Sequence, residues 1–264
     1  MGMIRAAGLG YEYLRYEEEG QEPEVTKAIE DVSLEIQKGQ FIAVLGHNGS
    51  GKSTLVNLIP RFYDVTEGKI TIDGKDIREV SQHDLRDRLG YVPQKGVLFS
   101  GTIASNLRFG KENATDAEIE KAAAIAQATE FIEAKDDKYE TAISQGGTNV
   151  SGGQKQRLAI ARAIAKDPKI FIFDDSFSAL DLKTDAALRK ALAENVKDST
   201  VIIVAQRIST ILHAEQILVL DDGKVVGKGT HEELLKNCKV YQEIAKSQLS
   251  AKELGIESEV ADHE

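Results

Sequence analysis

Two consecutive carboxylates, Asp174 and Asp175, close the apolar run Ile170–Phe173. An apolar strand that ends in Asp is typical of nucleotide hydrolases, which use this Asp to hold magnesium, often through water. The next residue in such enzymes is often a Glu that polarises the attacking water, but here it is Asp. The sequence therefore predicts that Asp174 holds magnesium and that Asp175 is a weaker polarising group. The pair becomes a strong signal only with a phosphate-binding loop upstream.

Such a loop lies upstream, because residues 46–53 have the spacing of a phosphate-binding loop with Gly, Gly, Lys and Ser at its fixed positions. Glycines let backbone N–H groups point at phosphate oxygens, and the following helix presents its positive N-terminus to the same anion. We expect Lys52 to reach the terminal phosphates and Ser53 to ligate magnesium. A chance Gly-rich turn is disfavoured, because the loop follows an apolar strand and precedes a helix. The nucleotide-binding residues predicted here are Gly46, Asn48, Gly49, Ser50, Gly51, Lys52, Ser53 and Thr54.

Strands and helices alternate along the chain, which favours a mainly parallel α/β core. The alternating segment 69–74 ends in a turn and is expected in an antiparallel β portion. The strand-length apolar runs of the core are 41–45, 170–173, 201–205 and 217–220.

Helices are expected from about Lys52 and through most of the segment 96–166. Capping signals open helices at Thr115, Ser151 and Thr230. The acidic stretch 17–24 is expected to be a solvated hairpin tip, and the tail after about residue 250 has too little apolar content to predict order.

The composition is that of a globular protein, with 264 residues of which 41% are hydrophobic and 29% are charged. The formal net charge of -10 argues against a nucleic-acid-binding surface. One cysteine, Cys238, excludes an intramolecular disulfide, and no motif marks it as a nucleophile. A packed or surface thiol in a reducing compartment is the simplest interpretation.

No apolar stretch approaches the ~20 residues that a membrane-spanning helix needs. The N-terminus lacks the apolar core of a signal peptide, and Met1-Gly2 before a second Met looks like a cloning remnant. We therefore expect a cytoplasmic chain that lies at the inner face of a membrane only through a partner.

The segment Val150-Ser151-Gly152-Gly153-Gln154 lies between the two nucleotide motifs. Here the chain resembles the ATP-binding-cassette (ABC) family, whose signature is a Ser-Gly-Gly-Gln helix start at this place. A glycine-rich helix start offers backbone donors to a phosphate. The resemblance implies that Ser151, Gly152, Gly153 and Gln154 contact the ATP of a second subunit, so that two chains enclose two nucleotides. A helix cap with no ligand is the alternative.

The resemblance implies further roles. Tyr13 is similar to the aromatic residue that stacks on adenine, although Tyr11 and Tyr16 are nearby rivals and a plain strand aromatic is the alternative. Gln94 resembles the glutamine that touches magnesium and senses the membrane partner. Asp181 belongs to the segment Ser178-Ala179-Leu180-Asp181, which resembles the family's loop that crosses the dimer interface.

Two residues depart from the family pattern, since Asp175 replaces the usual Glu and Gln206 replaces the usual His that contacts the γ-phosphate. The Asp carboxylate is set back by about 1.5 Å, roughly one carbon–carbon bond, and a misplacement of that order costs about 100-fold in rate. Gln cannot become a cation near neutral pH. Together with Lys52, these two residues are the predicted catalytic set, and the departures weaken hydrolysis while sparing binding.

This pattern is similar to the degenerate half of heterodimeric exporters in the family, in which one site hydrolyses poorly. The alternative is a slow homodimeric ATPase in which both positions have drifted.

The resemblance changes along the chain. The segments that look like a multidrug-type exporter are Pro60–Asp64, Leu98–Ile103, Ala205–Arg207 and the closing segment Tyr241–Gln248. Those that look like the ATPases of energy-coupling-factor importers are Tyr11–Arg15, the long acidic loop and the phosphate loop. Residues before about 53 would then be importer-type and residues after about 57 exporter-type. A recombined chain and a natural, divergent cassette are both open.

The resemblance predicts an α/β fold with a RecA-like P-loop NTPase core, an antiparallel β subdomain and an inserted α-helical subdomain. The expected divisions are 1–95, 96–166, 167–235 and 236–264. The expected ligands are ATP and Mg²⁺, and the expected partners are a second nucleotide-binding domain and transmembrane transporter domains. Two alternatives stay open, a non-transport ABC ATPase of ribosomes or DNA repair and an engineered cassette that retains only its fold and ATP binding.

Overall fold

The structure is a computed structural model that describes residues 3–15 and 22–250. Tyr16, most of the acidic stretch 17–24 and the tail after residue 250 lie outside the described residues. Contacts divide the chain into two compact units. The first unit comprises residues 1–37, 41–80 and 204–264, and the second comprises residues 38–40 and 81–203.

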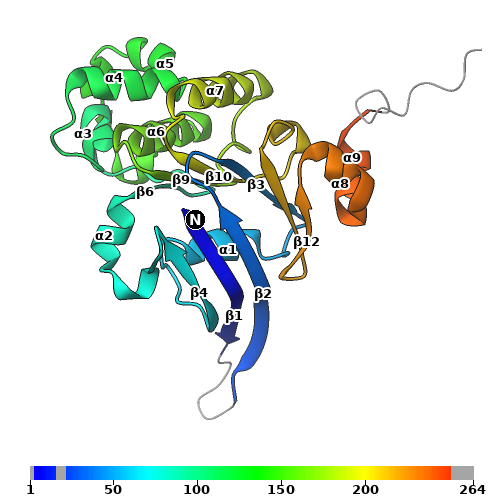
Figure 1. The fold of residues 1–264 in the computed structure, drawn as a ribbon. Coiled ribbons are helices and arrows are strands. Elements are labelled where there is room, and N and C mark those ends of the chain that lie inside the picture. The colour runs from blue at the N-terminus through cyan, green and yellow to red at the C-terminus, as the bar shows by residue number, and fades with distance from the viewer. Residues whose placement is uncertain (1–2, 16–21, 251–264) are drawn as a thin grey trace, which may run out of the picture. The chain divides into compact units, whose positions relative to one another are not determined.

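An antiparallel sheet forms one part of the first unit, with the strand order β2-β1-β4-β5 (Figure 1). The predicted antiparallel segment 69–74 lies largely in β4, which ends in a turn as expected. The buried face of the sheet includes Leu9, Ile29 and Ile70. These strands are β1 (Ile4–Arg15), β2 (Glu24–Ile36), β4 (Glu67–Ile72) and β5 (Lys75–Asp76).

The other strands of the first unit carry the phosphate loop and the chain's last helices. β3 (Phe41–Gly46) runs parallel to β11 (Gln216–Asp221), and β11 pairs with β12 (Lys224–Gly229) in an antiparallel hairpin. Both strands lie within one residue of the apolar runs that predicted them, because a buried strand needs an uninterrupted apolar stretch. The helices of this unit are α1 (Lys52–Leu58), α8 (His231–Asn237) and α9 (Lys239–Gln248), with short 3-10 turns η1 (Ile77–Glu79) and η4 (Ile208–Thr210).

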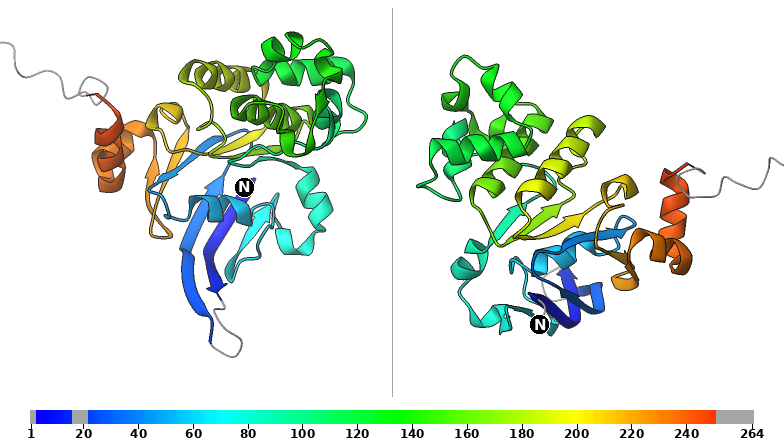
Figure 2. Two further views of the ribbon diagram at one scale, coloured as in Figure 1. Left: turned by 180° about the vertical axis from the view of Figure 1, so that it is seen from behind. Right: turned by 45° about the horizontal axis from the view of Figure 1, so that its top comes forward.

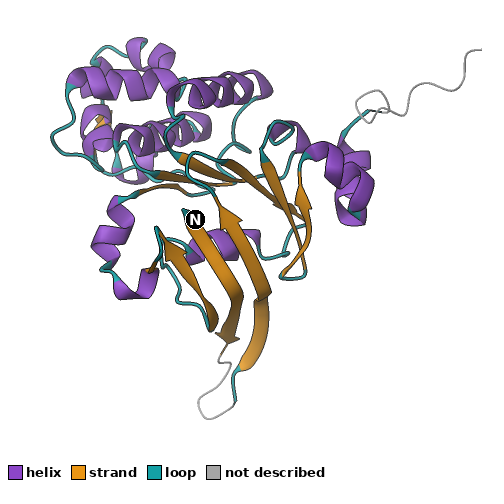
Figure 3. Cartoon of the chain, in the orientation of Figure 1, coloured by secondary structure: helices purple, strands orange, loops and turns teal. Residues whose placement is uncertain are grey.

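The second unit contains most of the described helices. Those between residues 103 and 195, coloured from green to yellow, gather in one group in both views of Figure 2, whereas the cyan helix Gln82–Asp87 lies apart from them; all helices are purple in Figure 3. Capping boxes form at Thr102, Thr115 and Ser151, and the last two were predicted from the sequence. The helices are α2 (Gln82–Asp87), α3 (Ile103–Arg108), α4 (Asp116–Ile125), α5 (Thr129–Glu133), α6 (Gly152–Ala165) and α7 (Leu182–Asn195), with 3-10 turns η2 (Lys138–Glu140) and η3 (Gln145–Gly147).

The strands of the second unit include three that lie in the order β10-β9-β6, with β9 parallel to β6. Every residue of β9 is buried, including its final Asp174. The prediction of a helical segment 96–166 missed a pair of two-residue strands, because so short a strand shows no sequence period. The strands are β6 (Leu89–Val92), β7 (Gly101–Thr102), β8 (Ala142–Ile143), β9 (Ile170–Asp174) and β10 (Thr200–Val204).

Candidate functional site

The predicted phosphate loop connects β3 to α1 in the first unit, and it is shaped by its glycines. Gly51 has a φ of 94°, and a Cβ there would approach the Ala28 carbonyl oxygen to 2.5 Å. A Cβ at Gly46 would lie 2.2 Å from the Leu220 carbonyl oxygen. Both positions therefore exclude any larger residue, because real Cβ atoms do not approach oxygen this closely. Helix α1 begins directly after Gly51 with no side-chain cap.

Lys52 folds back onto this loop. Its Nζ donates hydrogen bonds to the carbonyl oxygens of Gly46 and His47 at 2.8 and 2.6 Å, and to Ser50 Oγ at 3.5 Å. The side chain is only 8% exposed. These acceptors are neutral, and an anionic oxygen is a stronger partner for an ammonium group. The loop therefore holds the Lys52 ammonium against its own backbone carbonyls, and the binding of a phosphate by Lys52 stays a prediction.

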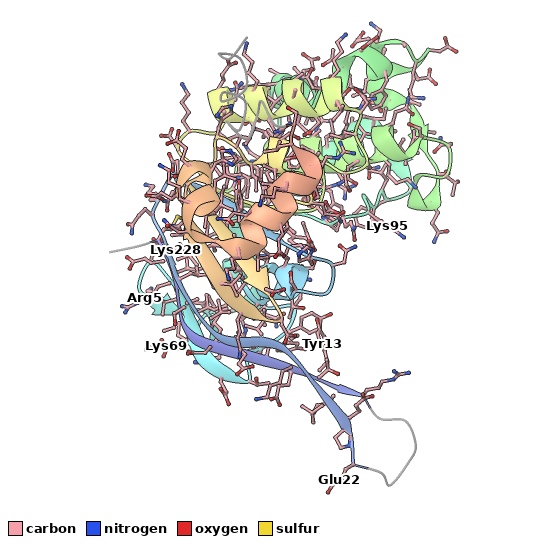
Figure 4. All side chains as sticks on the ribbon, turned by 90° about the vertical axis from the view of Figure 1, so that its right-hand side faces the viewer. Arg5, Tyr13, Glu22, Lys69, Lys95 and Lys228 are labelled. Atoms are coloured by element: carbon pink, nitrogen blue, oxygen red, sulfur yellow. The ribbon has the colours of Figure 1, made fainter. Side chains whose placement is uncertain are left out.

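An aromatic cluster lies beside the loop and consists of Tyr11, Tyr13 and Tyr63. The hydroxyl of Tyr13, a residue labelled in Figure 4, lies 3.1 Å from Thr54 Oγ1 in α1, so that the side chain of Tyr13 is anchored to this helix. The ring centroids of Tyr13 and Tyr63 are 5.9 Å apart, and the rings are 39% and 41% exposed. Tyr11 is half-buried, and burial raises its pKa. The predicted rival Tyr16 lies outside the described residues, whereas Tyr63 was missed because it is distant in sequence.

Gln206 also belongs to the first unit, two residues after the end of β10. The backbone N–H of its neighbour Ala205 donates to the Val44 carbonyl in β3 at 3.1 Å. The backbone carbonyl of Gln206 accepts a hydrogen bond from Gln248 Nε2 at 2.7 Å. The backbone of Gln206 is therefore held on both sides, while the residue is exposed.

The acidic pair lies in the second unit at the end of β9, and both carboxylates are 6% exposed. Gln94 Nε2 donates to Asp175 Oδ2 at 2.9 Å, and the Tyr91 hydroxyl donates to Asp174 Oδ2 at 3.4 Å. Asp175 has a φ of 49°, in the left-handed region that Asp tolerates better than most residues. The structure thus brings Gln94 and Asp175 together, two residues to which the sequence analysis gave separate roles.

The glycine-rich start of α6 forms a reciprocal cap. Ser151 Oγ accepts a hydrogen bond from the Gln154 backbone N–H at 3.2 Å, and Gln154 Oε1 accepts one from the Ser151 N–H at 3.1 Å. A Cβ at Gly152 would meet no atom within 4 Å, and at Gly153 only the Ala179 carbonyl oxygen at 3.7 Å. Packing inside the chain therefore does not require glycine at either position. Glycine also lowers the stability of a helix by about 0.5–1 kcal/mol relative to Ala.

Asp181 caps α7. Its carboxylate accepts hydrogen bonds from the Thr184 backbone N–H at 2.9 Å and from the Thr184 hydroxyl at 2.7 Å, and these bonds lower the pKa of Asp181. The structure thus gives Asp181 a local role as a helix cap.

A family model described as "ABC transporter" matches residues 29–178. The chain belongs to the ABC transporter family. It is 46% identical over 259 residues to an uncharacterized ABC transporter ATP-binding protein of Mycobacterium tuberculosis, covering 97% of this chain and 43% of the relative. It is 45% identical over 216 residues to a putative multidrug export ATP-binding/permease protein of Staphylococcus aureus, covering 82% of this chain and 37% of the relative.

A solved structure of a bacterial Atm1-family ABC exporter with ATP bound matches the fold with a TM-score of 0.84 and 35% sequence identity. The match covers 98% of this chain and 42% of that chain. The chain therefore has the mixed α/β fold of an ABC transporter ATP-binding domain, which confirms the predicted fold class, and it spans less than half the length of the relatives that it matches. Among residues 3–15 and 22–250, no helix is long and apolar enough to cross a membrane.

Gln156 has a structural role in this ABC domain that was not predicted from the sequence. It is 1% exposed in α6, where its Oε1 accepts from the Gly96 N–H at 2.8 Å and its Nε2 donates to the Pro93 carbonyl at 3.1 Å. The amide therefore binds the backbone on both sides of Gln94 and fixes this segment of the chain to helix α6. This role of Gln156 could not be predicted from the sequence, because the backbone groups that it binds lie more than fifty residues away along the chain.

Asn106 and Arg162 form a second buried network in the same unit. Asn106, 1% exposed, bonds to both the N–H and the carbonyl of Phe99 at 2.9 Å, and its Oδ1 accepts from Arg162 at 2.7 Å. Burial lowers the pKa of Arg162 to about 10, and its guanidinium lies 5.0 Å from the centroid of the Phe99 ring. Val97, Phe99 and Phe109 remain 53%, 43% and 62% exposed. The network thus fixes an apolar surface, here named the Phe99 surface and composed of these three residues.

Proposed function

We propose that this chain is the ATP-binding domain of an ABC exporter, that it binds Mg-ATP, and that ATP drives two such domains together face to face. The observation that carries the proposal is the buried Lys52 ammonium on a glycine loop that admits no larger residue at Gly46 or Gly51. A loop of this kind is suited to bind the phosphates of a nucleotide. The resemblance to an exporter solved with ATP bound supports the same ligand.

Magnesium fits the oxygen donors that the chain offers. Ser53, Gln94 and Asp174 supply a hydroxyl, an amide and a carboxylate oxygen, which are the hard ligands that magnesium prefers. Bound by them, magnesium would neutralise charge on the nucleotide phosphates. Lys52 would orient the terminal phosphates, and Tyr13, with Tyr63 beside it, would offer a face to adenine.

We infer that hydrolysis at this chain's own site is slow. Asp175 is the candidate for polarising water, but its carboxylate is short and one of its oxygens accepts from Gln94. Gln206 offers no cation to the γ-phosphate. These features support a site that binds ATP well and turns it over poorly, as in the degenerate half of an asymmetric dimer.

The signature segment supports the face-to-face dimer. Ser151 caps a 14-residue helix that begins with Gly152 and Gly153, and a Cβ at either glycine would meet nothing closer than 3.7 Å. Backbone donors at a helix start suit the phosphates of a nucleotide held by the opposite domain.

Replacing Gly153 with Ala tests this part of the proposal. We expect the isolated chain to gain up to about 1 kcal/mol of stability, because Ala favours the helix and finds space at this position. We also expect ATP-driven dimerisation, measured by sedimentation at saturating Mg-ATP, to weaken, because the added methyl group blocks close approach. A variant that is stabilised and still dimerises normally would show that Gly153 does not face the partner's nucleotide.

The membrane partner is proposed to dock on the Phe99 surface. Val97, Phe99 and Phe109 are exposed apolar side chains, and an apolar patch on a surface can mark an interaction site. Gln156 and Asn106 bind the backbone of this region on both sides, at Pro93 and Gly96 and at Phe99. A transporter helix seated there would hold the chain at the cytoplasmic face of the membrane and receive the motion of the Gln94 segment.

A thermal shift with Mg-ATP tests nucleotide binding directly. At 100 times its Kd, ATP is expected to stabilise the chain by about 2.7 kcal/mol, which corresponds to a rise in Tm of about 5–10 °C for a domain of this size. Lys52→Ala should abolish the shift, since the ammonium that contacts the phosphates is lost. Lys69→Ala is the matched control, because Lys69 is an exposed lysine of β4 in the same unit. An undiminished shift in Lys52→Ala would contradict the assignment of the phosphate loop.

A further inference from the structure

Gln248, the last residue of α9, binds the backbone of the loop that carries Gln206. Its Nε2 donates to the Gln206 carbonyl at 2.7 Å, and its Oε1 accepts from the Ile208 N–H at 2.8 Å. One amide thus satisfies two backbone groups that flank a single residue, as a neighbouring strand would. The contact spans about forty residues of sequence, so that it depends entirely on the position of α9.

Helix α9 is a firm support for this amide. Its Tyr241 and Ala245 are fully buried and Ile244 is 6% exposed, and the helix packs against β3, β11, β12 and η4. The Tyr241 hydroxyl lies 2.6 Å from His231 Nδ1 in α8, which joins the two last helices. Gln248 itself is exposed, but the helix that carries it is held by the core of the first unit, the unit that also contains the phosphate loop.

We propose that Gln248 is a positioning residue that sets the direction of Gln206 toward the terminal phosphate of ATP. The inference rests on the proposed function, in which Gln206 faces the γ-phosphate. Two restraints fix the backbone of the loop, one from Val44 to Ala205 and one from Gln248 to Gln206 and Ile208. The first comes from strand β3, which leads into the phosphate loop, and the second comes from the C-terminal helix. Loss of the second would let the Gln206 side chain swing away while the phosphate loop stays intact.

The test compares affinities for Mg-ATP and Mg-ADP in the full chain with Gln248→Met, which keeps side-chain length and removes both hydrogen bonds. ADP lacks the γ-phosphate and serves as the internal control. We expect Gln248→Met to weaken ATP about threefold to tenfold, the range for one or two hydrogen bonds, and to leave ADP affinity unchanged. Gln242→Met is the matched control on the same helix, because Gln242 Nε2 donates instead to the Leu235 carbonyl at 2.8 Å. It should alter neither affinity.

Two further variants distinguish a failure of this inference from a failure of the proposed function. Gln206→Ala should also lower the preference for ATP over ADP, and adding Gln248→Met to it should have no further effect, because the two residues act through one contact. If Gln206→Ala keeps the full preference, the proposed role of Gln206 is wrong and the positioning role falls with it. If Gln206→Ala loses the preference while Gln248→Met keeps it, or if Gln242→Met matches Gln248→Met, the positioning role alone is wrong.

Discussion

Replacing Asp175 with Glu and Gln206 with His is expected to raise ATP turnover by about 100-fold at saturating ATP. Glu extends the carboxylate by one methylene toward the attacking water, and correcting a misplacement of this order is worth about that factor. His adds a side chain that can carry positive charge near neutral pH. The measurement is steady-state phosphate release under conditions in which the domain dimerises.

Two controls accompany this double variant. Asp175→Asn keeps the shape of the side chain and removes its charge, so that turnover should fall to background while ATP affinity stays the same. Stability should fall slightly in the double variant, because residue 175 has a φ of 49°, which suits Asp better than Glu. Turnover that stays flat in the double variant at saturating ATP would contradict the account of a degenerate site.

Replacing Asn106 with Leu is expected to lower the free energy of unfolding by about 3 kcal/mol. The substitution keeps the number and branching of the side-chain heavy atoms but removes the amide that bonds to the Phe99 backbone and to Arg162. Buried N–H and carbonyl groups then lose their partners, and each such loss costs about 1–3 kcal/mol. The expected fall in Tm is about 6–12 °C.

Asn195→Leu is the matched control for this stability prediction. Asn195 is exposed on α7 and its Nδ2 donates only to the Ala191 carbonyl of its own helix, so the change should stay within about 0.5 kcal/mol. Denaturant unfolding followed by circular dichroism measures both variants. If Asn106→Leu were as stable as Asn195→Leu, the Asn106 network would not hold the Phe99 surface in place.

Local features of the structure could be predicted from the sequence. The caps at Thr115, Ser151 and Thr230 form as expected, since each capping box depends on residues only three positions apart. The buried strands β3 and β9 lie where the apolar runs placed them. The glycine-rich loop lies between β3 and α1, as the sequence pattern of a strand, a glycine-rich turn and a helix predicted.

Contacts between distant segments could not be predicted in this way. Tyr63 beside Tyr13, Gln156 around the Gln94 segment and Gln248 on the Gln206 loop all depend on tertiary packing. A glutamine on a helix looks the same in sequence whether it faces water or binds a remote backbone. The suggested recombination near residues 53–57 stays a prediction, as do the roles of the site residues.

The most direct test of the central claim is the affinity of the chain for Mg-ATP, measured together with its steady-state turnover in one preparation. The account predicts tight binding and near-zero turnover, because Lys52 and the glycine loop are intact while Asp175 and Gln206 weaken hydrolysis. Brisk turnover would contradict the degenerate site and indicate a self-sufficient ATPase. Absence of binding would contradict the account as a whole.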